Sequence, residues 1–460
     1  MADDRPRKHP VDEVLPIPKL AMYGFQHVLA FYAGAVVVPI LLAGALGLSP
    51  EQLVYLINAD LFTCGIATIV QSLGFWKIGI RLPIVQGVTF TAVAPMIAIG
   101  QGANGGTAAL LAIYGATITA GLVMFLLAPY LGRVLRLFPP VVTGTVLTIM
   151  GLVLLPNAIT DAAGGAAAKG VPGEFGSWKH LAYAGGTLLF ILALYRLRRP
   201  FLSSIAVLLG LVGGTLVSFA LGDTDFDQVG KSDWLGVTTP FHFGTPTFHI
   251  GAILAMLLVM MVTVVETVGD SKAVGEIVGK DVSDDDITRA LRADGASTFL
   301  GGTLNAFPYT CFAQNVGLVR LTGVRSRFVV VAAGVIMMVL GLFPKAAAYV
   351  AAIPSDVLGG AAIAMFGMVA VVGIQTLAKA DLRQERNALV VAISIGMALV
   401  PTTLPAFGDN MPRDLAALLD SGITLGSLTA ILLNLVFNVF TRTPPSGPGE
   451  IPAAEPSKAA

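Results

Sequence analysis

Two carboxylates stand out in one of the most apolar segments of the chain, "GAILAMLLVMMVTVVETVGDSKAVG". Glu266 and Asp270 are four residues apart, so they lie on one face of a helix. A third, Asp294, stands near the start of the next apolar segment. An ionisable group inside a membrane is costly and indicates a functional site. Two alternatives stay open. Residues 251–265 span only about 22 Å of helix, so Glu266 could mark the end of the segment, and Asp294 could be a cap or an interfacial residue.

Two adjacent side-chain amides, Gln314 and Asn315, interrupt another apolar segment, "FPYTCFAQNVGLVRLTGV". Pro308 precedes them and Gly317 follows them, and both residue types disrupt regular helices. A single amide can join two membrane helices by a hydrogen bond, but two adjacent amides point to different faces. We therefore predict that this pair belongs to an irregular strand that lines a cavity.

The histidine within an apolar segment is His27, which follows Gln26 in "YGFQHVLAFYAG". A packing residue held by a hydrogen bond and a functional residue are both compatible with this position. Cys64 and Cys311 also fall in apolar segments, and we expect small core residues there, with no disulfide and no metal site. The chain has no H-E-x-x-H, P-loop or G-x-S-x-G motif, so we predict that it is not an enzyme.

The elements that must position these side chains are membrane spans. The chain of 460 residues is 55% hydrophobic and 12% charged, whereas soluble domains carry about 25% charged residues. Apolar runs of about twenty residues recur throughout, which is typical of a polytopic membrane protein. The net charge of zero indicates no nucleic-acid partner. We predict fourteen spans, centred near residues 32, 62, 90, 119, 147, 189, 211, 259, 297, 315, 335, 366, 395 and 432.

The distribution of basic residues supports this count. If the N-terminus is cytoplasmic and the sides alternate, 23 of the 28 Lys and Arg residues fall on the inner side. Cytoplasmic loops carry such an excess, and an even number of spans places both termini in the cytoplasm. The remaining five basic residues fall on the outer side: Lys169, Lys179, Lys231, Lys345 and Arg413.

The third and tenth spans are short and interrupted by Gly and Pro. The third, "RLPIVQGVTFTAVAPM", begins near Pro83 and ends at Pro95 and Met96. Each is the third span of its half of the chain, and seven spans per half means that the halves insert with opposite orientation. Paired broken spans in inverted repeats indicate the binding site of a transporter near the middle of the membrane.

The stretch Gln314–Val324, "QNVGLVRLTGV", closely resembles the signature of the nucleobase–ascorbate transporter family, also called nucleobase:cation symporter-2. Four further motifs of that family recur here in order: "QH" at 26–27, "QGVTF" at 86–90, "ETVGD" at 266–270 and "ADG" at 293–295. The resemblance covers essentially the whole chain. It implies an all-α polytopic membrane protein with 14 transmembrane segments in two inverted seven-span repeats, with short strands in spans 3 and 10.

The resemblance also implies how the chain is divided into domains. A core domain would move against a gate domain that forms a homodimer, in an elevator mechanism of alternating access. The implied ranges are a cytoplasmic N-terminal tail at 1–19, the core at 20–135 and 248–345, the gate at 136–222 and 354–441, and a disordered cytoplasmic tail at 442–460. The composition favours a bacterial inner-membrane protein.

For the site, the resemblance implies that Glu266 and Gln314 bind a nucleobase through their side chains. Phe90 and Ala313 would contribute backbone groups. Ionised Glu266 can accept hydrogen bonds from ring N–H groups, and Gln314 can both donate and accept. A carboxylic acid in a low-dielectric cavity can be tied to proton symport; the sequence does not exclude Na⁺, and no other cofactor is expected. The implied residues of coupling and support are His27, Asp270, Asp294, Asn315 and Gln26.

Within the family, uracil carriers resemble "ENxG" at this signature, and carriers of xanthine or urate resemble "QNxG". Gln314 therefore favours an oxidised purine as substrate. A uracil–proton symporter is the first alternative, and an anion carrier of the same inverted-repeat fold is a less favoured one because an anion site is not expected to contain a carboxylate.

Overall fold

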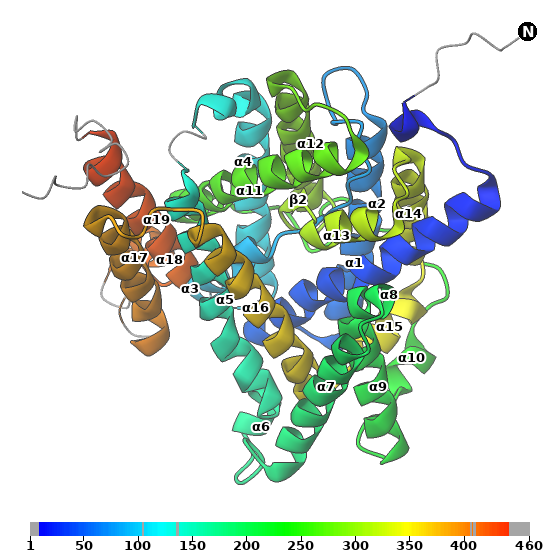
Figure 1. Cartoon of the computed structure of the whole chain (residues 1–460). Helices are drawn as coiled ribbons and strands as arrows, with labels where there is room; N and C mark the ends of the chain where they lie inside the picture. The colour runs from blue at the N-terminus through cyan, green and yellow to red at the C-terminus, as the bar shows by residue number, and fades with distance from the viewer. Residues whose placement is uncertain (1–8, 104, 135–137, 405–406, 408–410, 441–460) are drawn as a thin grey trace, which may run out of the picture.

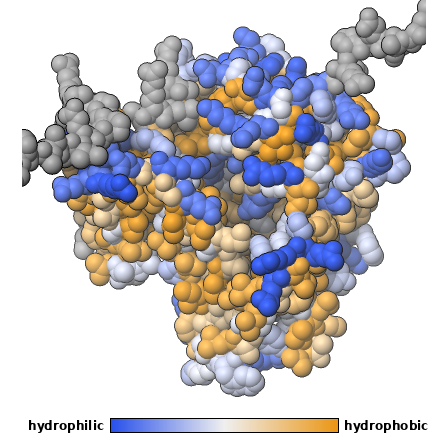
Figure 2. All heavy atoms as spheres, in the orientation of Figure 1, coloured by the Kyte–Doolittle hydropathy of each residue, from blue (hydrophilic) through white to orange (hydrophobic). Residues whose placement is uncertain are grey.

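The computed structural model describes residues 9–103, 105–134, 138–404, 407 and 411–440. It shows an all-helical, polytopic membrane protein with one small sheet. Within the described residues, eight helices are long and apolar enough to cross a membrane, or nine if one bent pair counts as a single span. Figure 2 shows hydrophobic side chains over the flanks of the molecule and hydrophilic ones gathered at the top.

The long helices form two groups (Figure 1). In the first group, α12 packs on α4, α14 packs on α1 and α2, and α11 packs on α4. The bounds in this group are α1 (Ile17–Leu46), α2 (Pro50–Leu73), α4 (Gly106–Val134), α11 (Ile250–Val278), α12 (Asp284–Thr303) and α14 (Arg327–Leu340).

In the second group, α16 packs on α5 and α7, α9 packs on α7, and α17 packs on α19. The bounds are α5 (Pro140–Ala162), α7 (Trp178–Arg196), α9 (Ala206–Ala220), α16 (Ser355–Leu377), α17 (Glu385–Thr403) and α19 (Gly422–Asn434). Short helices complete both groups: α6 (Gly165–Lys169), α8 (Pro200–Ser204), α10 (Asp227–Lys231), α15 (Pro344–Ala351), α18 (Arg413–Leu419) and the π-helical turn Leu435–Val439.

Glycines allow the closest helix pairs to approach. A Cβ atom on Gly295 of α12 would meet the backbone of Phe125 on α4, and one on Gly151 of α5 would meet the backbone of Ala370 on α16. Membrane helices associate through such small residues because lipid gives little hydrophobic driving force between them.

Two broken spans meet in the sheet. Strand β1 (Gln86–Val88) leads into the 3-10 turn η2 (Phe90–Ala92) and helix α3 (Val93–Gly102). Strand β2 (Tyr309–Cys311) leads into helix α13 (Ala313–Thr322). The strands are antiparallel, with Gln86 opposite Cys311 and Val88 opposite Tyr309. The prediction of short strands in the third and tenth spans is confirmed.

All fourteen predicted span centres fall in a helix or, for residue 90, in η2. Fewer helices pass as complete spans for three reasons: α3, α9 and α13 are short, α14 and α15 bend by 85° at the break between them, and α7 and α12 are long enough but not apolar enough. The number of membrane crossings stays a prediction. Cys64 and Cys311 are buried and free, so their prediction as core residues is confirmed.

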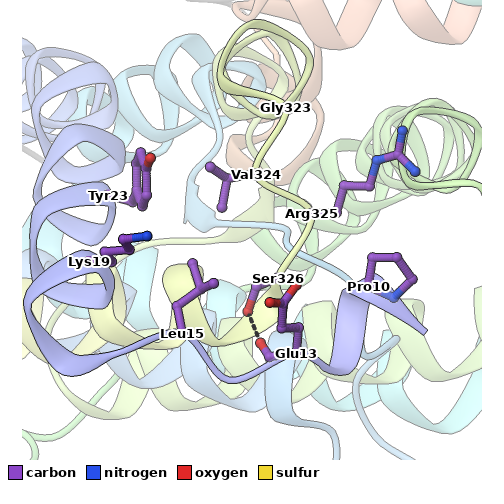
Figure 3. A pocket seen from close by; sticks show the side chains of 9 residues that line it. All are labelled: Pro10, Glu13, Leu15, Lys19, Tyr23, Gly323, Val324, Arg325 and Ser326. Carbon is purple, nitrogen blue, oxygen red and sulfur yellow. Dashed lines mark hydrogen bonds between the residues drawn. The ribbon is translucent and has the colours of Figure 1, made fainter. Parts of the chain in front are cut away.

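The segment before α1 packs on the first helix group. Val11 is buried in a cluster with Ile80 and Leu82, and Asp12 Oδ1 forms an ion pair with Arg327 Nε at 2.8 Å. Figure 3 shows Ser326 Oγ donating to the backbone oxygen of Glu13, at 2.5 Å, beside a cavity of about 250 Å³. Residues 9–16 of the predicted tail are therefore attached to the protein, and helix α1 already begins at Ile17. The predicted tail 442–460 lies outside the described residues.

Candidate functional site

The candidate site lies at the two paired strands, where each strand ends and the helix after it begins. η2 follows β1 and α13 follows β2, so two helical N-termini emerge from opposite sides of the sheet. In the described part of the chain, the backbone N–H groups of Phe90 and Ala313 have no hydrogen-bond acceptor. Free N–H groups at helix N-termini bind anionic or carbonyl oxygens. The arrangement therefore offers two donors close to the crossing point.

Side chains of α2 hold the first strand in place. Thr68 Oγ1 donates to the backbone oxygen of Gln86 at 3.2 Å and accepts from its N–H at 3.0 Å. Ser72 Oγ donates to the oxygen of Ile84 at 2.9 Å. These two residues lie four positions apart and so share one face of α2. That face replaces the sheet neighbours that the short strand lacks.

The same face of α2 also fixes the second strand. Tyr309 of β2 donates its O–H to Asp60 Oδ1 at 2.8 Å, and Cys64 Sγ lies 3.7 Å from Asp60 Oδ2. All three side chains are buried. The polar residues of this face recur at four-residue intervals: Asp60, Cys64, Thr68 and Ser72. They form one polar stripe on α2 that supports both strands of the sheet.

Glu266 lies on α11 beside η2. Its Oε1 accepts a hydrogen bond of 3.0 Å from Thr91 Oγ1, and its side chain is half-buried. Helix α11 continues to Val278, twelve residues beyond Glu266. Glu266 is therefore not at the end of its helix, and the alternative that it marks the cytoplasmic end of the membrane span stays open.

Asp294 is fully buried within α12. Its Oδ2 accepts from Thr267 Oγ1 at 2.5 Å, and its Oδ1 accepts from the amide nitrogen of Gln86. Ser297 Oγ in turn donates to the oxygen of that amide at 2.7 Å. Asp294 lies ten residues inside α12, so the alternative that it is a helix cap is wrong, whereas the alternative that it lies at the membrane interface stays open. The network ties α11, α12 and β1 together.

The adjacent amides do point in different directions, as the sequence predicts. Asn315 is buried, and its Oδ1 is hydrogen-bonded to Nδ1 of buried His27 on α1. Gln314 is exposed on the other side of α13. However, both residues lie in the first turn of α13, because β2 ends at Cys311 and Phe312 is the N-cap. The prediction that the pair belongs to an irregular strand is wrong.

The accessible face of the site lies between α11 and α13, which contact each other. On α13, Ala313, Gln314 and Gly317 are exposed, and no atom lies within 4 Å of a Cβ built on Gly317. On α11, Gly269 is exposed and Asp270 is half-buried. Glu266 and Asp270 thus lie on a helix that contacts the helix of Gln314. Asp270 forms no hydrogen bond or ion pair with any described residue.

The second helix group closes the site from the opposite side. The ring of Phe366 on α16 contacts the ring of Phe90 edge-on, with centroids 5.9 Å apart. Met150 Sδ on α5 lies 2.9 Å from Thr91 Oγ1. Phe312 packs between Phe90 and Phe31, with centroid distances of 6.1 and 4.7 Å. Aromatic walls of this kind suit a flat ring.

Sequence analysis missed several residues that support the site. Thr91 and Thr267 bind carboxylates, and Asp60 supports β2. A signal did exist, because these polar residues interrupt apolar segments, but their partners are too far along the chain to be predicted. Gln26, in contrast, is half-buried and makes no hydrogen bond with a described residue. No three His, Cys, Asp or Glu side chains of the described residues are arranged to hold a metal ion.

Comparison with known sequences covers nearly the whole chain. A family model described as "Permease family" matches residues 18–407. The uric acid transporter UacT of Escherichia coli is 46% identical over 437 residues, which are 95% of this chain and 89% of that protein. The xanthine permease of Bacillus subtilis is 43% identical over 424 residues, which are 92% of this chain and 95% of that protein.

Solved structures share the fold at low identity. The transmembrane domain of the cyanobacterial bicarbonate transporter BicA matches with a TM-score of 0.62 at 16% identity, over 88% of this chain and 99% of that one. The murine anion transporter Slc26a9 matches with a TM-score of 0.60 at 13% identity, over 93% of this chain and 70% of that one. These matches concern the fold alone.

Proposed function

We propose, from the premise that this chain belongs to the xanthine and uracil permease family (nucleobase:cation symporter-2), that it imports xanthine or urate by proton symport. The observation that carries the proposal is the position of Glu266 beside η2, where its Oε1 accepts from Thr91 Oγ1 at 3.0 Å, one residue from the free N–H group of Phe90. Gln314 and the free N–H group of Ala313 lie in the first turn of α13, which packs on the helix of Glu266. Relatives named for xanthine and uric acid transport are 43–46% identical to it. The chain is a transporter and not an enzyme.

A purine dione or trione presents alternating N–H donors and C=O acceptors around a flat ring. Ionised Glu266 accepts from ring N–H groups, and Gln314 both donates and accepts. The N–H groups of Phe90 and Ala313 donate to ring carbonyls, while Phe90, Phe312 and Phe366 provide apolar contact. A molecule without the matching edge leaves buried polar groups unpaired and is rejected.

Proton coupling is supported by the charges around the site. Three carboxyl groups lie on adjoining elements, Glu266, Asp270 and Asp294, and none forms an ion pair with a Lys or Arg among the described residues. Unpaired carboxylates are costly at membrane depth, so protons that bind with the substrate would compensate them. His27 and Asn315 hold α1 against α13 and would transmit this change. No observation favours Na⁺.

For the architecture, we propose fourteen spans in two inverted repeats. The first helix group corresponds to the core, residues 20–135 and 248–345, and the second to the gate, residues 136–222 and 354–441. The core would move against the gate, carrying the substrate between them. The excess of basic residues on one side favours cytoplasmic termini, and the exposed face near Gly269 and Gln314 would then open toward the cytoplasm. Two chains would form a homodimer through their gates. The protein would lie in the inner membrane of a bacterium.

An anion carrier is the second candidate because the fold matches that of anion transporters. Glu266 disfavours it, since an inorganic anion has no ring N–H groups from which an ionised carboxylate could accept. A uracil carrier is the third, and Gln314 disfavours it by the resemblance described above.

The test is uptake of labelled xanthine into proteoliposomes under an inward proton gradient, with urate, uracil and bicarbonate as competitors. We expect accumulation that a protonophore abolishes, that urate blocks and that uracil and bicarbonate leave unchanged. Gln314→Glu should weaken urate competition and introduce uracil competition. Accumulation without a proton gradient, or equal competition by uracil in the unmodified chain, would contradict the coupling or the specificity respectively.

A further inference from the structure

Thr91 contacts both helix groups at the point where they meet. Its Oγ1 lies 3.0 Å from Glu266 Oε1 and 2.9 Å from Met150 Sδ. Thr91 and Glu266 lie on elements of the first helix group, whereas Met150 lies on α5 of the second. Thr91 is fully buried and Met150 is 4% exposed, so water does not compete for the contact between them.

A threonine hydroxyl has one proton and therefore donates to one acceptor at a time. An ionised carboxylate is a much stronger acceptor than a thioether, so ionised Glu266 takes the Thr91 proton. When Glu266 is protonated, its own O–H can donate to the Thr91 oxygen. The Thr91 proton is then free to point at Met150 Sδ. The two contacts are therefore alternatives, and the proton on Glu266 selects between them.

We propose that Thr91 is a positioning residue that couples the protonation of Glu266 to the contact between the two helix groups. With Glu266 protonated, the Thr91–Met150 hydrogen bond attaches η2 to α5. With Glu266 ionised, Thr91 turns to the carboxylate and that attachment is lost. The inference rests on the proposed function, in which one helix group moves against the other, and it adds a specific contact through which the proton acts.

The electrostatic surroundings of Glu266 consist of other acids. Asp270, on the same helix, and Asp294, on α12, both interact with its charge, and the hydroxyls of Thr89 and Thr310 lie beside it. Among the described residues, no Lys or Arg forms an ion pair with any of these acids. Protonation of Glu266 is therefore opposed by no neighbouring cation. Thr91 is the neighbour whose hydrogen bond to Glu266 also decides the contact with Met150 between the two helix groups.

The decisive test needs no substrate. Equilibrium unfolding in mixed micelles is measured for the unmodified chain, Thr91→Val, Met150→Leu and the double variant, at pH values from about 5 to about 9. At the acidic end, we expect the effect of the double variant on the unfolding equilibrium constant to differ about fivefold from the product of the two single effects, which is the size of one hydrogen bond. At the alkaline end, we expect the two single effects to be additive in free energy. In a Glu266→Gln background, whose amide N–H donates permanently to the Thr91 oxygen, the non-additivity should persist at every pH.

Additive effects at all pH values, or non-additivity that does not change with pH in the unmodified background, would overturn the proposal. If Thr91→Val fails to fold, Met150→Leu alone decides the matter, because it must destabilise the chain at acidic pH and leave it unchanged at alkaline pH. Thr91→Ser, which keeps the hydroxyl, should behave like the unmodified chain.

The consequence for transport is measured by exchange of labelled xanthine across proteoliposomes at equal pH on both sides. We expect Thr91→Val and Met150→Leu each to change the exchange rate about fivefold at acidic pH, with no further change in the double variant. If the two substitutions are non-additive in unfolding at acidic pH but the unmodified chain does not exchange xanthine, the proposed substrate is refuted and the Thr91 contact is supported. If the unmodified chain exchanges xanthine but the two substitutions are additive in unfolding at all pH values, the Thr91 contact alone is refuted.

Discussion

Replacing Tyr309 by Phe tests whether the buried acid behind the sheet supports the site. The change removes one O–H group, which donates to Asp60 Oδ1 at 2.8 Å. Tyr309 is 0% and Asp60 1% exposed, so water cannot replace the lost donor. The other contact of this carboxyl, from Cys64 Sγ at 3.7 Å, reaches Oδ2 and not Oδ1. The substitution therefore leaves a buried acceptor unpaired.

An unpaired buried acceptor costs about 1–3 kcal/mol. We expect the upper half of this range for Tyr309→Phe, about 2–3 kcal/mol of unfolding free energy, because no other described donor reaches Asp60 Oδ1. Asp60→Asn keeps an oxygen that can accept from Tyr309, so it should cost less than half as much. Tyr130 is 61% exposed, and Tyr130→Phe is the matched control, with an expected change within about 0.5 kcal/mol.

The assay is equilibrium unfolding in mixed micelles, followed by xanthine uptake with the variants that fold. Because β2 leads directly into Phe312 and Ala313, displacement of the strand should raise KM more than it lowers the maximal rate. The reasoning is refuted if Tyr309→Phe and Tyr130→Phe unfold with the same free energy. It is also refuted if Asp60→Asn costs as much as Tyr309→Phe.

Four other predictions concern separate parts of the molecule. Glu266→Gln should retain xanthine exchange but lose accumulation driven by a proton gradient; unchanged accumulation would contradict the coupling role. Gly87→Ala would direct a methyl group into the rings of Phe31 and Phe312, so we expect a loss of about 1–3 kcal/mol in unfolding free energy, whereas Gly44→Ala, with open space around it, is the control. Arg327→Ala should expose residues 9–16 to proteolysis, because Arg327 holds Asp12 and the end of α2; equal cleavage rates would contradict this. Hydrogen bonds from Lys179 and Tyr183 hold the pKa of Asp223, in the loop after α9, below its usual range. The stability that Asp223 contributes is therefore present above the usual aspartate pKa and is lost as the pH falls through the lowered value. Thermal unfolding of Asp223→Asn should accordingly depend less on pH at the acidic end than that of the unmodified chain.

The sequence predicts the local breaks in the chain better than the contacts between distant residues. Pro and Gly around 83–95 and 308–317 predict the two interrupted spans, because their effects on the backbone are local. The opposite directions of Gln314 and Asn315 are likewise predictable from their adjacency. The start of α13 is not, because Phe312 becomes an N-cap only once β2 is held by pairing with Val85 and Gln86.

The supporting contacts depend on distances that a sequence does not contain. Asn315 meets His27 across 288 positions, and Gln86 meets Asp294 across 208. The roles of Asp60 and Thr68 were missed although they recur at helical spacing, because an apolar segment with scattered polar residues is also typical of a helix packed among other helices. The third dimension is needed to show that their common face meets the sheet.

Both cysteines lie in this supporting layer, and that has a practical consequence. Cys64 and Cys311 are 0% and 2% exposed, and each lies beside a polar side chain, Asp60 and Gln71 respectively. A maleimide reagent should therefore leave the natural chain unlabelled while it is folded. A cysteine introduced at an exposed position such as Gly269 or Gly317 could be followed during transport without replacing either native thiol, and the polar stripe of α2 would stay intact.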